Sequence, residues 1–213
     1  MLSLVNIKVS RIKNRVNLVF SDKNYLPFFI DDVVRLSLAK NQELSPEILD
    51  QIKSLCLLYL GKEYALRQIA ISPKTEKILF YKLKIFLFRT TQKFKLLSSI
   101  PTDLIASQII TQLKDKKLLN ESSFVDYFIK KNKSKSVTEI KYLLKQQGVD
   151  ISSLNLSSQN ENQSIIKILS KKNVNQELLS DYGYKNKLYA SLFRKGFSVS
   201  SIKTAIDEYL TLQ

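Results

Sequence analysis

The chain has 213 residues, of which 44% are hydrophobic, and it contains only four glycines and four prolines. This composition supports a buried core, excludes a wholly disordered chain and disfavours an all-β sandwich, which needs many turns. The net charge of +15 suits a polyanion or an acidic protein surface as partner, or it reflects a lysine-rich proteome without such a partner.

Residues 1–30 are predicted to form a short β-meander of three strands. The runs VNIKVSRI, RVNLVF and YLPFFI are rich in β-branched and aromatic residues, and two turn sequences, Lys13-Asn14 and Ser21–Asn24, separate them. Because Pro27 cannot donate a ladder hydrogen bond, we expect the third strand to be short or to lie at an edge.

The hydrophobic period becomes helical after the meander, and residues 31–51 are predicted to be a linking helical segment. Ser45 as N-cap and Pro46 in the first turn indicate the start of a helix that runs to about Ala70. A second helix is expected from Ser72, again with a proline one step inside. A third begins at Pro101, and its inward face is predicted to comprise Leu104, Ile105, Ile109 and Leu113.

The second half of the chain predicts shorter helices. Asn120 can cap a helix over 121–131, whose predicted inward stripe consists of Phe124, Val125 and Phe128. Ser136 and Glu139 form a possible capping box before a helix that Gly148 can end. The polar stretch 150–164 is predicted to be the loosest connection, and helix resumes after it.

The last two helices are predicted to meet at Gly196, with Ser198 as the N-cap of the second. The pattern of Glu139–Val149 can be laid over Lys187–Phe197, and the apolar positions of the helix after Pro101 match those of the final helix. A repeat of this kind indicates stacked helical units. We therefore predict three three-helix repeats, at 52–118, 119–172 and 173–213.

The residue types argue against an enzyme. The chain has no histidine and a single cysteine, Cys56, which excludes histidine-dependent nucleophiles and histidine or multi-thiolate metal sites. Cys56 lies in an apolar run and is interpreted as a buried core residue. Gly61-Lys62 lacks the rest of a phosphate-binding loop. We expect no catalytic residues, no metal and no cofactor.

The N-terminus has no signal-peptide pattern, and the most apolar later stretch, ILFYKLKIFLF, is too short and too charged to span a membrane. We therefore expect a cytoplasmic protein that does not bind membranes.

Four segments together resemble the RecX family of bacterial recombination regulators. They are VVRLSLAKNQELSPEIL at 33–49, SPKTEKILFYKL at 72–83, KKLLNESSFVDYFIKK at 116–131 and KLYASLFRKGFSVSSIKTAI at 187–206. The first repeat departs most from the family pattern, with Thr75 and Ile78 where serine and glutamate are usual. The resemblance implies a mainly helical fold of tandem three-helix repeats in an elongated, curved arc, after the N-terminal meander.

The resemblance also implies a non-catalytic modulator of the RecA recombinase. Family members bind the RecA filament on single-stranded DNA, limit its extension and inhibit ATP hydrolysis, strand exchange and repressor cleavage. DNA repair and the SOS response are thereby modulated. We expect a monomer that binds such a filament, with weak binding to single- or double-stranded DNA.

The candidate contact residues are the basic groups nearest the repeat motifs, and they are favoured as a group rather than singly. They are Lys74, Lys77, Lys130, Lys131, Lys133, Lys135, Lys141, Lys145, Lys185, Lys187, Arg194 and Lys195.

Two other functions remain open at this point. A helical-repeat protein that binds nucleic acid directly, without a recombinase, would show binding that weakens steeply with salt. A structural adaptor with incidental charge would neither bind DNA nor affect a recombinase.

Overall fold

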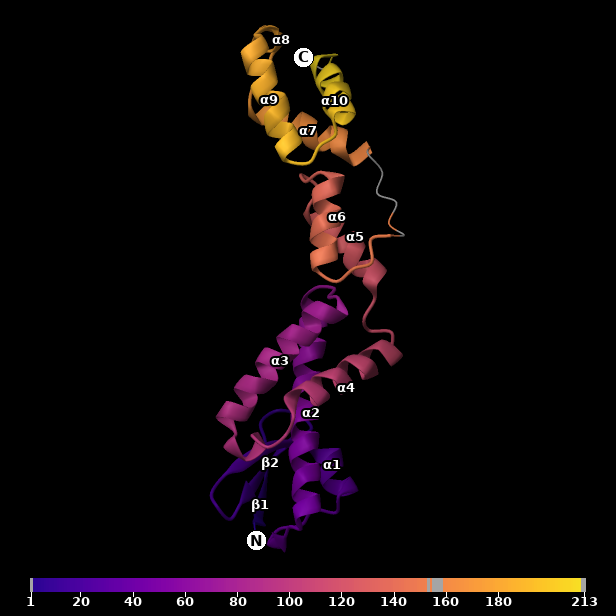
Figure 1. The fold of residues 1–213 in the computed structure, drawn as a ribbon. Coiled ribbons are helices and arrows are strands. Elements are labelled where there is room, and N and C mark those ends of the chain that lie inside the picture. Colours follow the sequence, from indigo (N-terminus) through magenta and orange to yellow (C-terminus); the bar gives the residue numbers. More distant parts are fainter. Residues whose placement is uncertain (1, 153, 155–158, 212–213) are drawn as a thin grey trace. The chain divides into compact units, whose positions relative to one another are not determined.

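The structure is a computed structural model, and it describes residues 2–152, 154 and 159–211. These residues are mainly helical, with a small antiparallel sheet near the N-terminus, as the sequence predicts (Figure 1). The chain divides into two compact units, Met1–Asn120 and Glu121–Gln213, which we call the N-terminal unit and the C-terminal unit. The division into three repeats stays a prediction.

The sheet of the N-terminal unit has four strands in the order β3-β2-β1-β4, each antiparallel to its neighbour. Pro27 lies in the edge strand β3, as predicted. The three strands predicted within residues 1–30 are present, but the segment predicted to be a helical link also contributes a short fourth strand, β4. Two residues are too few to show an alternating pattern in the sequence. The strands are β1 (Ser3–Val9), β2 (Arg15–Phe20), β3 (Tyr25–Phe29) and β4 (Gln42–Glu43).

Helices make up the rest of the N-terminal unit. Ser45 caps the long second helix, since its hydroxyl accepts a hydrogen bond from the amide of Ile48 at 3.4 Å. The elements are α1 (Ile30–Arg35), α2 (Pro46–Ile71), α3 (Glu76–Lys93), the short 3-10 turn η1 (Lys95–Leu97) and α4 (Thr102–Asp115).

Two details of these helices differ from the sequence-based expectation. The helix expected from Ser72 begins at Glu76, because Thr75 provides the N-cap and accepts from the amide of Ile78 at 3.2 Å. Leu104, predicted to face inward, is 67% exposed. The buried stripe of α4 instead includes Ala106 and Ile110 beside Ile105, Ile109 and Leu113.

The core of the N-terminal unit extends from the sheet through α2, α3 and α4. On β2, Val16, Leu18 and Phe20 are buried and alternate with partly exposed residues, as expected of a strand with one face on a core. At Gly61 on α2, an added Cβ would lie 2.6 Å from Ile109 Cδ1. The glycine therefore allows the close approach of α2 and α4.

The regular elements of the C-terminal unit are all helices over its described residues. The polar stretch 150–164, predicted to be a connection, already contains the first turns of α7, so that part of the prediction was wrong. Residues 153 and 155–158 of the stretch lie outside the described residues. The helices are α5 (Glu121–Lys131), α6 (Val137–Gln146), α7 (Gln159–Lys171), α8 (Gln176–Ser180), α9 (Tyr182–Arg194) and α10 (Val199–Thr211).

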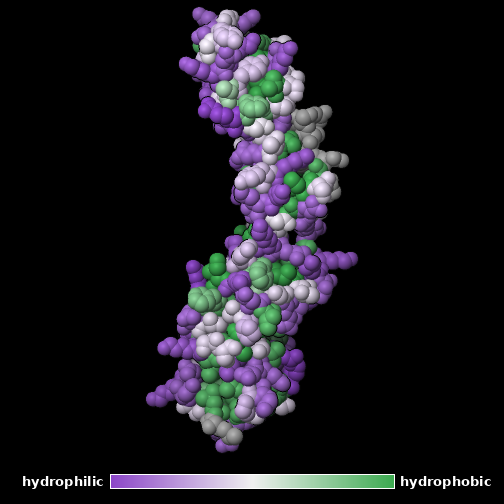
Figure 2. Space-filling model, in the orientation of Figure 1, coloured by the Kyte–Doolittle hydropathy of each residue, from purple (hydrophilic) through white to green (hydrophobic). Residues whose placement is uncertain are grey.

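A second core joins α7, α9 and α10. Its buried side chains include Ile165 and Leu169 from α7, Leu192 from α9, and Ile202 and Ile206 from α10. Figure 2 shows hydrophilic side chains over much of the visible face of each unit, with hydrophobic patches among them.

The two predicted glycine turns have the same geometry. Gly148 and Gly196 have φ values of 86° and 83°, a region that favours glycine. In each turn the amide after the glycine bonds back to a leucine carbonyl five residues earlier, as in a Schellman C-cap. Ser198 caps the next helix as predicted, because its hydroxyl accepts from the amide of Ser201 at 3.0 Å.

Among the described residues, no helix combines the length and the apolar character that a membrane crossing requires.

Candidate partner and nucleic-acid interface

Two of the predicted contact residues lie in the N-terminal unit, at the start of α3. The ammonium of Lys74 donates to the carbonyl oxygen of Ser72 at 2.7 Å, so this lysine contacts the backbone of the segment just before the helix. Lys77 is exposed in the first turn of α3. The other ten predicted residues belong to the C-terminal unit.

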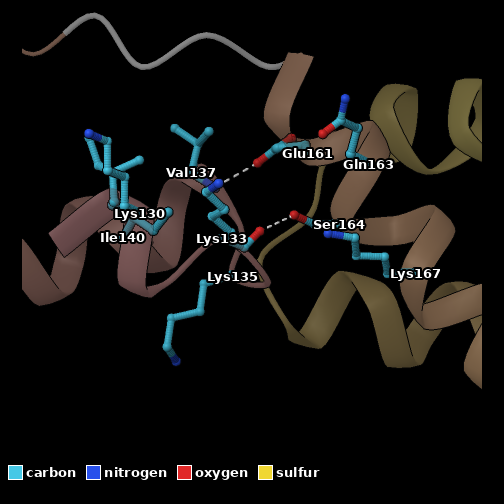
Figure 3. Close-up of a pocket in the computed structure, with 10 residues that line it drawn as sticks. Lys130, Lys133, Lys135, Val137, Ile140, Glu161, Gln163, Ser164 and Lys167 are labelled. Atoms are coloured by element: carbon cyan, nitrogen blue, oxygen red, sulfur yellow. Dashed lines mark hydrogen bonds between the residues drawn. The ribbon is translucent and has the colours of Figure 1, made fainter. Parts of the chain in front are cut away.

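A pocket of about 270 Å³ brings three of those ten together. Lys130 comes from the last turn of α5, and Lys133 and Lys135 come from the turn that leads to α6. Lys167 of α7, which was not among the predicted residues, also lines the pocket. Figure 3 shows side chains from the α5–α6 hairpin and from α7 around it. The remaining lining residues are Ile129, Val137, Ile140, Glu161, Gln163 and Ser164.

Glu161 is the carboxylate of this pocket, and both of its oxygens are engaged. It is only 6% exposed. Oε1 accepts from the amide of Val137 at 2.8 Å, and Oε2 accepts from the hydroxyl of Ser201 at 2.8 Å. A negative charge at the N-terminus of α6 is favourable, because free amides and the helix dipole point at it. Glu161 therefore ties α7 to α6 and to α10.

Two serines complete the junction between the α5–α6 hairpin and the rest of the unit. The hydroxyl of Ser164 on α7 donates to the carbonyl of Lys133, in the turn before α6 (Figure 3). Ser136 is fully buried, caps α6 by accepting from the amide of Glu139 at 3.1 Å, and donates to the carbonyl of Lys195 at 2.8 Å. The basic turn after α9 is thus held against the N-terminus of α6.

Gly196 is needed in this junction for a second reason besides its positive φ. A Cβ at this position would lie 2.7 Å from the hydroxyl oxygen of Ser136. The turn can therefore approach the α6 cap only because residue 196 has no side chain.

The remaining predicted cations of the C-terminal unit do not form one cluster with the pocket. Lys131 lies over the ring of Tyr127, with 5.8 Å between its ammonium and the ring centroid. The others lie along two helices: Lys141 and Lys145 on α6, Lys185, Lys187 and Arg194 on α9, and Lys195 at the C-cap of α9.

The pocket lysines differ in whether they have an acidic partner. Lys135 forms an ion pair with Glu139 one helical turn away. Within the part of the chain that the structure describes, Lys130, Lys133 and Lys167 have no ion pair. The pocket therefore carries more positive than negative charge, since Glu161 is the one acidic side chain among its described lining residues.

The sequence analysis missed Glu161 and Ser164 because it treated 150–164 as a connection, and it missed Lys167 because it considered only the basic residues nearest the repeat motifs. A usable signal was present. Glu161 precedes the buried Ile165 by four residues, so extending the helix backwards by one turn places its carboxylate on the inward face.

The thiol of Cys56 has the character of a core residue, which confirms its predicted burial. The side chain is 0% exposed, and Sγ donates to the carbonyl oxygen of Pro27 at 3.1 Å. Burial raises the pKa of the thiol to about 12, which disfavours the nucleophilic thiolate. The described residues contain no group of three or more His, Cys, Asp or Glu side chains placed to hold a metal ion.

No protein-family model matches the chain. Individual relatives match the chain along nearly its whole length. Regulatory protein RecX of Streptococcus mutans is 28% identical over 215 residues, which cover 95% of this chain and 77% of the relative. Regulatory protein RecX of Clostridium beijerinckii is 29% identical over 210 residues, covering 95% and 92%. These matches support the assignment of the chain to the RecX family.

RecX crystal structures share the fold. One matches with a TM-score of 0.63 over 97% of this chain and 100% of the solved chain, at 17% identity. RecX from Lactobacillus salivarius matches with a TM-score of 0.52 over 72% of this chain and 96% of the solved chain, at 22% identity. The fold likeness thus agrees with the sequence relationship.

Proposed function

We propose that this chain is a non-catalytic regulator of a RecA-type recombinase. It binds the recombinase filament on single-stranded DNA and limits filament extension, ATP hydrolysis and strand exchange, and so modulates DNA repair and the SOS response. The observation that carries this proposal is the similarity to RecX regulatory proteins along 95% of the chain.

The basic surface of the C-terminal unit supports the proposal. A single exposed ion pair contributes only about 0–1 kcal/mol, so a filament contact requires several charges that act together. The C-terminal unit provides such a set. It consists of the pocket lysines, Lys141 and Lys145 on α6, and Arg194 and Lys195 at the turn after α9. Long-range attraction to the phosphates of the bound strand then speeds association.

The test is DNA-dependent ATP hydrolysis by the cognate recombinase, with this protein titrated below the recombinase concentration. We expect inhibition by the wild-type chain and its loss in an Arg194→Glu/Lys195→Glu variant. The matched control is Lys171→Glu/Lys172→Glu, which changes net charge equally at exposed positions outside the predicted set. Absence of inhibition by the wild-type chain would contradict the proposal.

Direct binding to DNA without a recombinase is a second candidate, favoured by the excess of positive charge around the pocket. It predicts that the isolated chain binds DNA and that the affinity falls steeply with salt. Regulation of filaments requires an effect at protein concentrations that leave naked DNA mostly unbound. Comparing the two concentration ranges separates the candidates.

A further inference from the structure

The outer side of α3 in the N-terminal unit carries a row of apolar side chains that no described element covers. α3 packs on α2 and α4 through its other side, where leucines from three successive turns are buried (Figure 1). Tyr81, Ile85 and Phe88 are each more than half exposed. Single exposed apolar residues are ordinary on a protein surface, whereas three on one face of one helix form a continuous patch.

The spacing of these residues is that of a helix–helix contact. Ile78, which is partly exposed, is followed by Tyr81, Ile85 and Phe88 in steps of three, four and three residues. Residues spaced in this way lie in one line along a helix, and the same alternation of steps marks the line along which two helices pack. We call these four residues the α3 seam, and at about 1.5 Å per residue it is about 15 Å long.

The first part of the α3 seam is already ordered by contacts within the helix. The rings of Tyr81 and Phe80 meet edge to face, with their centroids 6.2 Å apart, and the ammonium of Lys84 lies 5.6 Å from the centroid of Phe80. A side chain that is ordered before binding loses less conformational entropy when a partner docks.

The residues on both sides of the α3 seam are cations. They are Lys77 and Lys84 on one flank, and Lys82 and Arg89 on the other. These positions adjoin the apolar line, where the charges of one helix meet those of the other in paired helices. Lys84 has an acidic partner, Asp103 of α4, at 2.8 Å, whereas Lys82 and Arg89 have no ion pair among the described residues.

No carboxylate of α3 itself balances these flanks. Glu76 is the one acidic residue in the sequence of the helix, and it pairs with Lys114 of α4 at 2.8 Å. A second copy of the chain docked by the same face would therefore place cations opposite cations, which is unfavourable. A helix with an acid on each side of its apolar stripe is complementary to the seam and to both flanks.

Two other occupants fit the face less well. A lipid surface takes up a broad apolar face of a helix, whereas the broader apolar face of α3, with its leucines, is enclosed in the core. A single nucleic-acid strand stacks its bases on aromatic side chains, and the central residue of the exposed row, Ile85, is aliphatic.

We propose that the α3 seam docks an amphipathic helix of a protein partner, with acidic residues on both sides of the partner's apolar stripe. The stripe packs on Tyr81, Ile85 and Phe88, and the acids face the flanking cations. Because both flanks are basic, the partner helix can run in either direction. This docking face lies on the N-terminal unit, so the inference goes beyond the proposed function, whose contacts are mainly on the C-terminal unit.

The experiment measures binding of designed helical peptides to the full-length chain by fluorescence anisotropy. The acidic probe is a side-chain-bridged helix of about three heptads, with leucine along the apolar line and glutamate at the flanking positions. The basic probe differs only in having lysine at those positions. We expect the wild-type chain to bind the acidic probe at least about tenfold more tightly than the basic one, because like charges oppose docking.

The seam variant replaces the three exposed apolar residues by glutamine, as Tyr81→Gln/Ile85→Gln/Phe88→Gln. It should bind the acidic probe at least about tenfold more weakly, since the apolar anchors of the contact are lost. The matched control should stay near wild type, because it changes the same three residue types at exposed positions outside α3. That control is Ile71→Gln/Tyr142→Gln/Phe193→Gln. If the seam variant does not fold, Ile85→Gln alone makes the comparison.

The flank variant, Lys82→Glu/Arg89→Glu, tests the assignment of charge. It should weaken binding of the acidic probe and strengthen binding of the basic one, so that the ratio of the two affinities falls at least about tenfold. An unchanged ratio would show that the flanks do not select the partner.

Three results would overturn the inference. The first is equal binding of the acidic probe by the seam variant and the wild-type chain. The second is self-association of the wild-type chain, measured by sedimentation, that the seam variant abolishes, since a second copy would then occupy the face. The third is binding to vesicles of anionic phospholipid that the seam variant abolishes. None of these measurements contains a recombinase, so the outcome is independent of that of the proposed function.

Discussion

The N-terminal unit and the C-terminal unit are held together by different means. In the N-terminal unit, one continuous apolar core connects the sheet to α2, α3 and α4. In the C-terminal unit, the apolar core joins α7, α9 and α10, and the buried side chains of the α5–α6 hairpin, such as Leu144, are not part of it over the described residues. Glu161, Ser136 and Ser164 attach that hairpin through hydrogen bonds instead.

This difference has a functional meaning. A junction packed by apolar side chains excludes charged groups, because burying them is costly. A junction made of polar side chains tolerates lysine side chains at its edge, where their ammonium groups stay in water. The lysine-lined pocket lies at the polar junction. We infer that the N-terminal unit mainly supplies stability and that the C-terminal unit supplies charged contacts.

The largest effect is expected from opening a cavity in the N-terminal core. Leu87 on α3 is 0% exposed, so Leu87→Ala should lower the free energy of unfolding by about 2–5 kcal/mol. Leu104→Ala makes the same chemical change at a position that is 67% exposed. This variant should change the free energy of unfolding by less than about 0.5 kcal/mol. Chemical denaturation measures both. Similar losses in the two variants would contradict the described core.

The polar junction should be weakened by removing its carboxylate. Glu161→Ala leaves the amide of Val137 and the hydroxyl of Ser201 without their acceptor, at a cost of about 1–3 kcal/mol. Glu161→Gln should recover part of this loss because one acceptor oxygen is retained. Hydrogen exchange at the Val137 amide reports the local effect. Unchanged protection in Glu161→Ala would show that the junction does not depend on this residue, and Glu208→Ala, at an exposed position of α10, serves as the control.

A side chain at the basic turn should disturb the same junction from the other side. Gly196→Ala introduces a Cβ at a φ of 83° and next to the Ser136 hydroxyl, and should destabilise the unit by about 1–2 kcal/mol. Gly183→Ala, in the first turn of α9, the helix that precedes this turn, is the matched change without a positive φ. Thermal unfolding should separate the two variants, and equal melting temperatures would argue against the close approach at residue 196.

The smallest effect at neutral pH concerns Cys56. Because the pKa of the thiol rises from its ordinary 9.0 to about 12 on burial, the folded chain keeps its proton while the unfolded chain loses it above about pH 9. The free energy of unfolding should therefore fall by up to about 1.4 kcal/mol per pH unit between those two values, and this contribution is fully present below pH 9. Cys56→Ala should lack that component of the pH dependence. Rapid reaction of the native thiol with a disulfide reagent at pH 8 would contradict the burial.

Features that depend on local chemistry could be predicted from the sequence. The cap at Ser45, the glycine turns and the burial of Cys56 each follow from the properties of one or two residues. β4 could not be predicted, because its two residues gain their conformation from pairing with β1.

The site was only partly predictable for a similar reason. Lysines near the repeat motifs could be named, yet a sequence does not show which ammonium groups have partners. Lys135 pairs with Glu139, whereas Lys133 two residues earlier lines the pocket without an ion pair. Glu161 was overlooked because a buried acid interrupts the apolar pattern, and its burial is possible only because distant residues, Val137 and Ser201, donate to it.

Regulation of a recombinase filament is tested by measuring the rate of filament extension on long single-stranded DNA. The cognate recombinase is observed with and without this chain at a concentration where the chain alone leaves the DNA mostly unbound. We predict slower extension at substoichiometric amounts of the chain, and normal extension with the Arg194→Glu/Lys195→Glu variant. An extension rate that is the same with and without the wild-type chain would contradict the account.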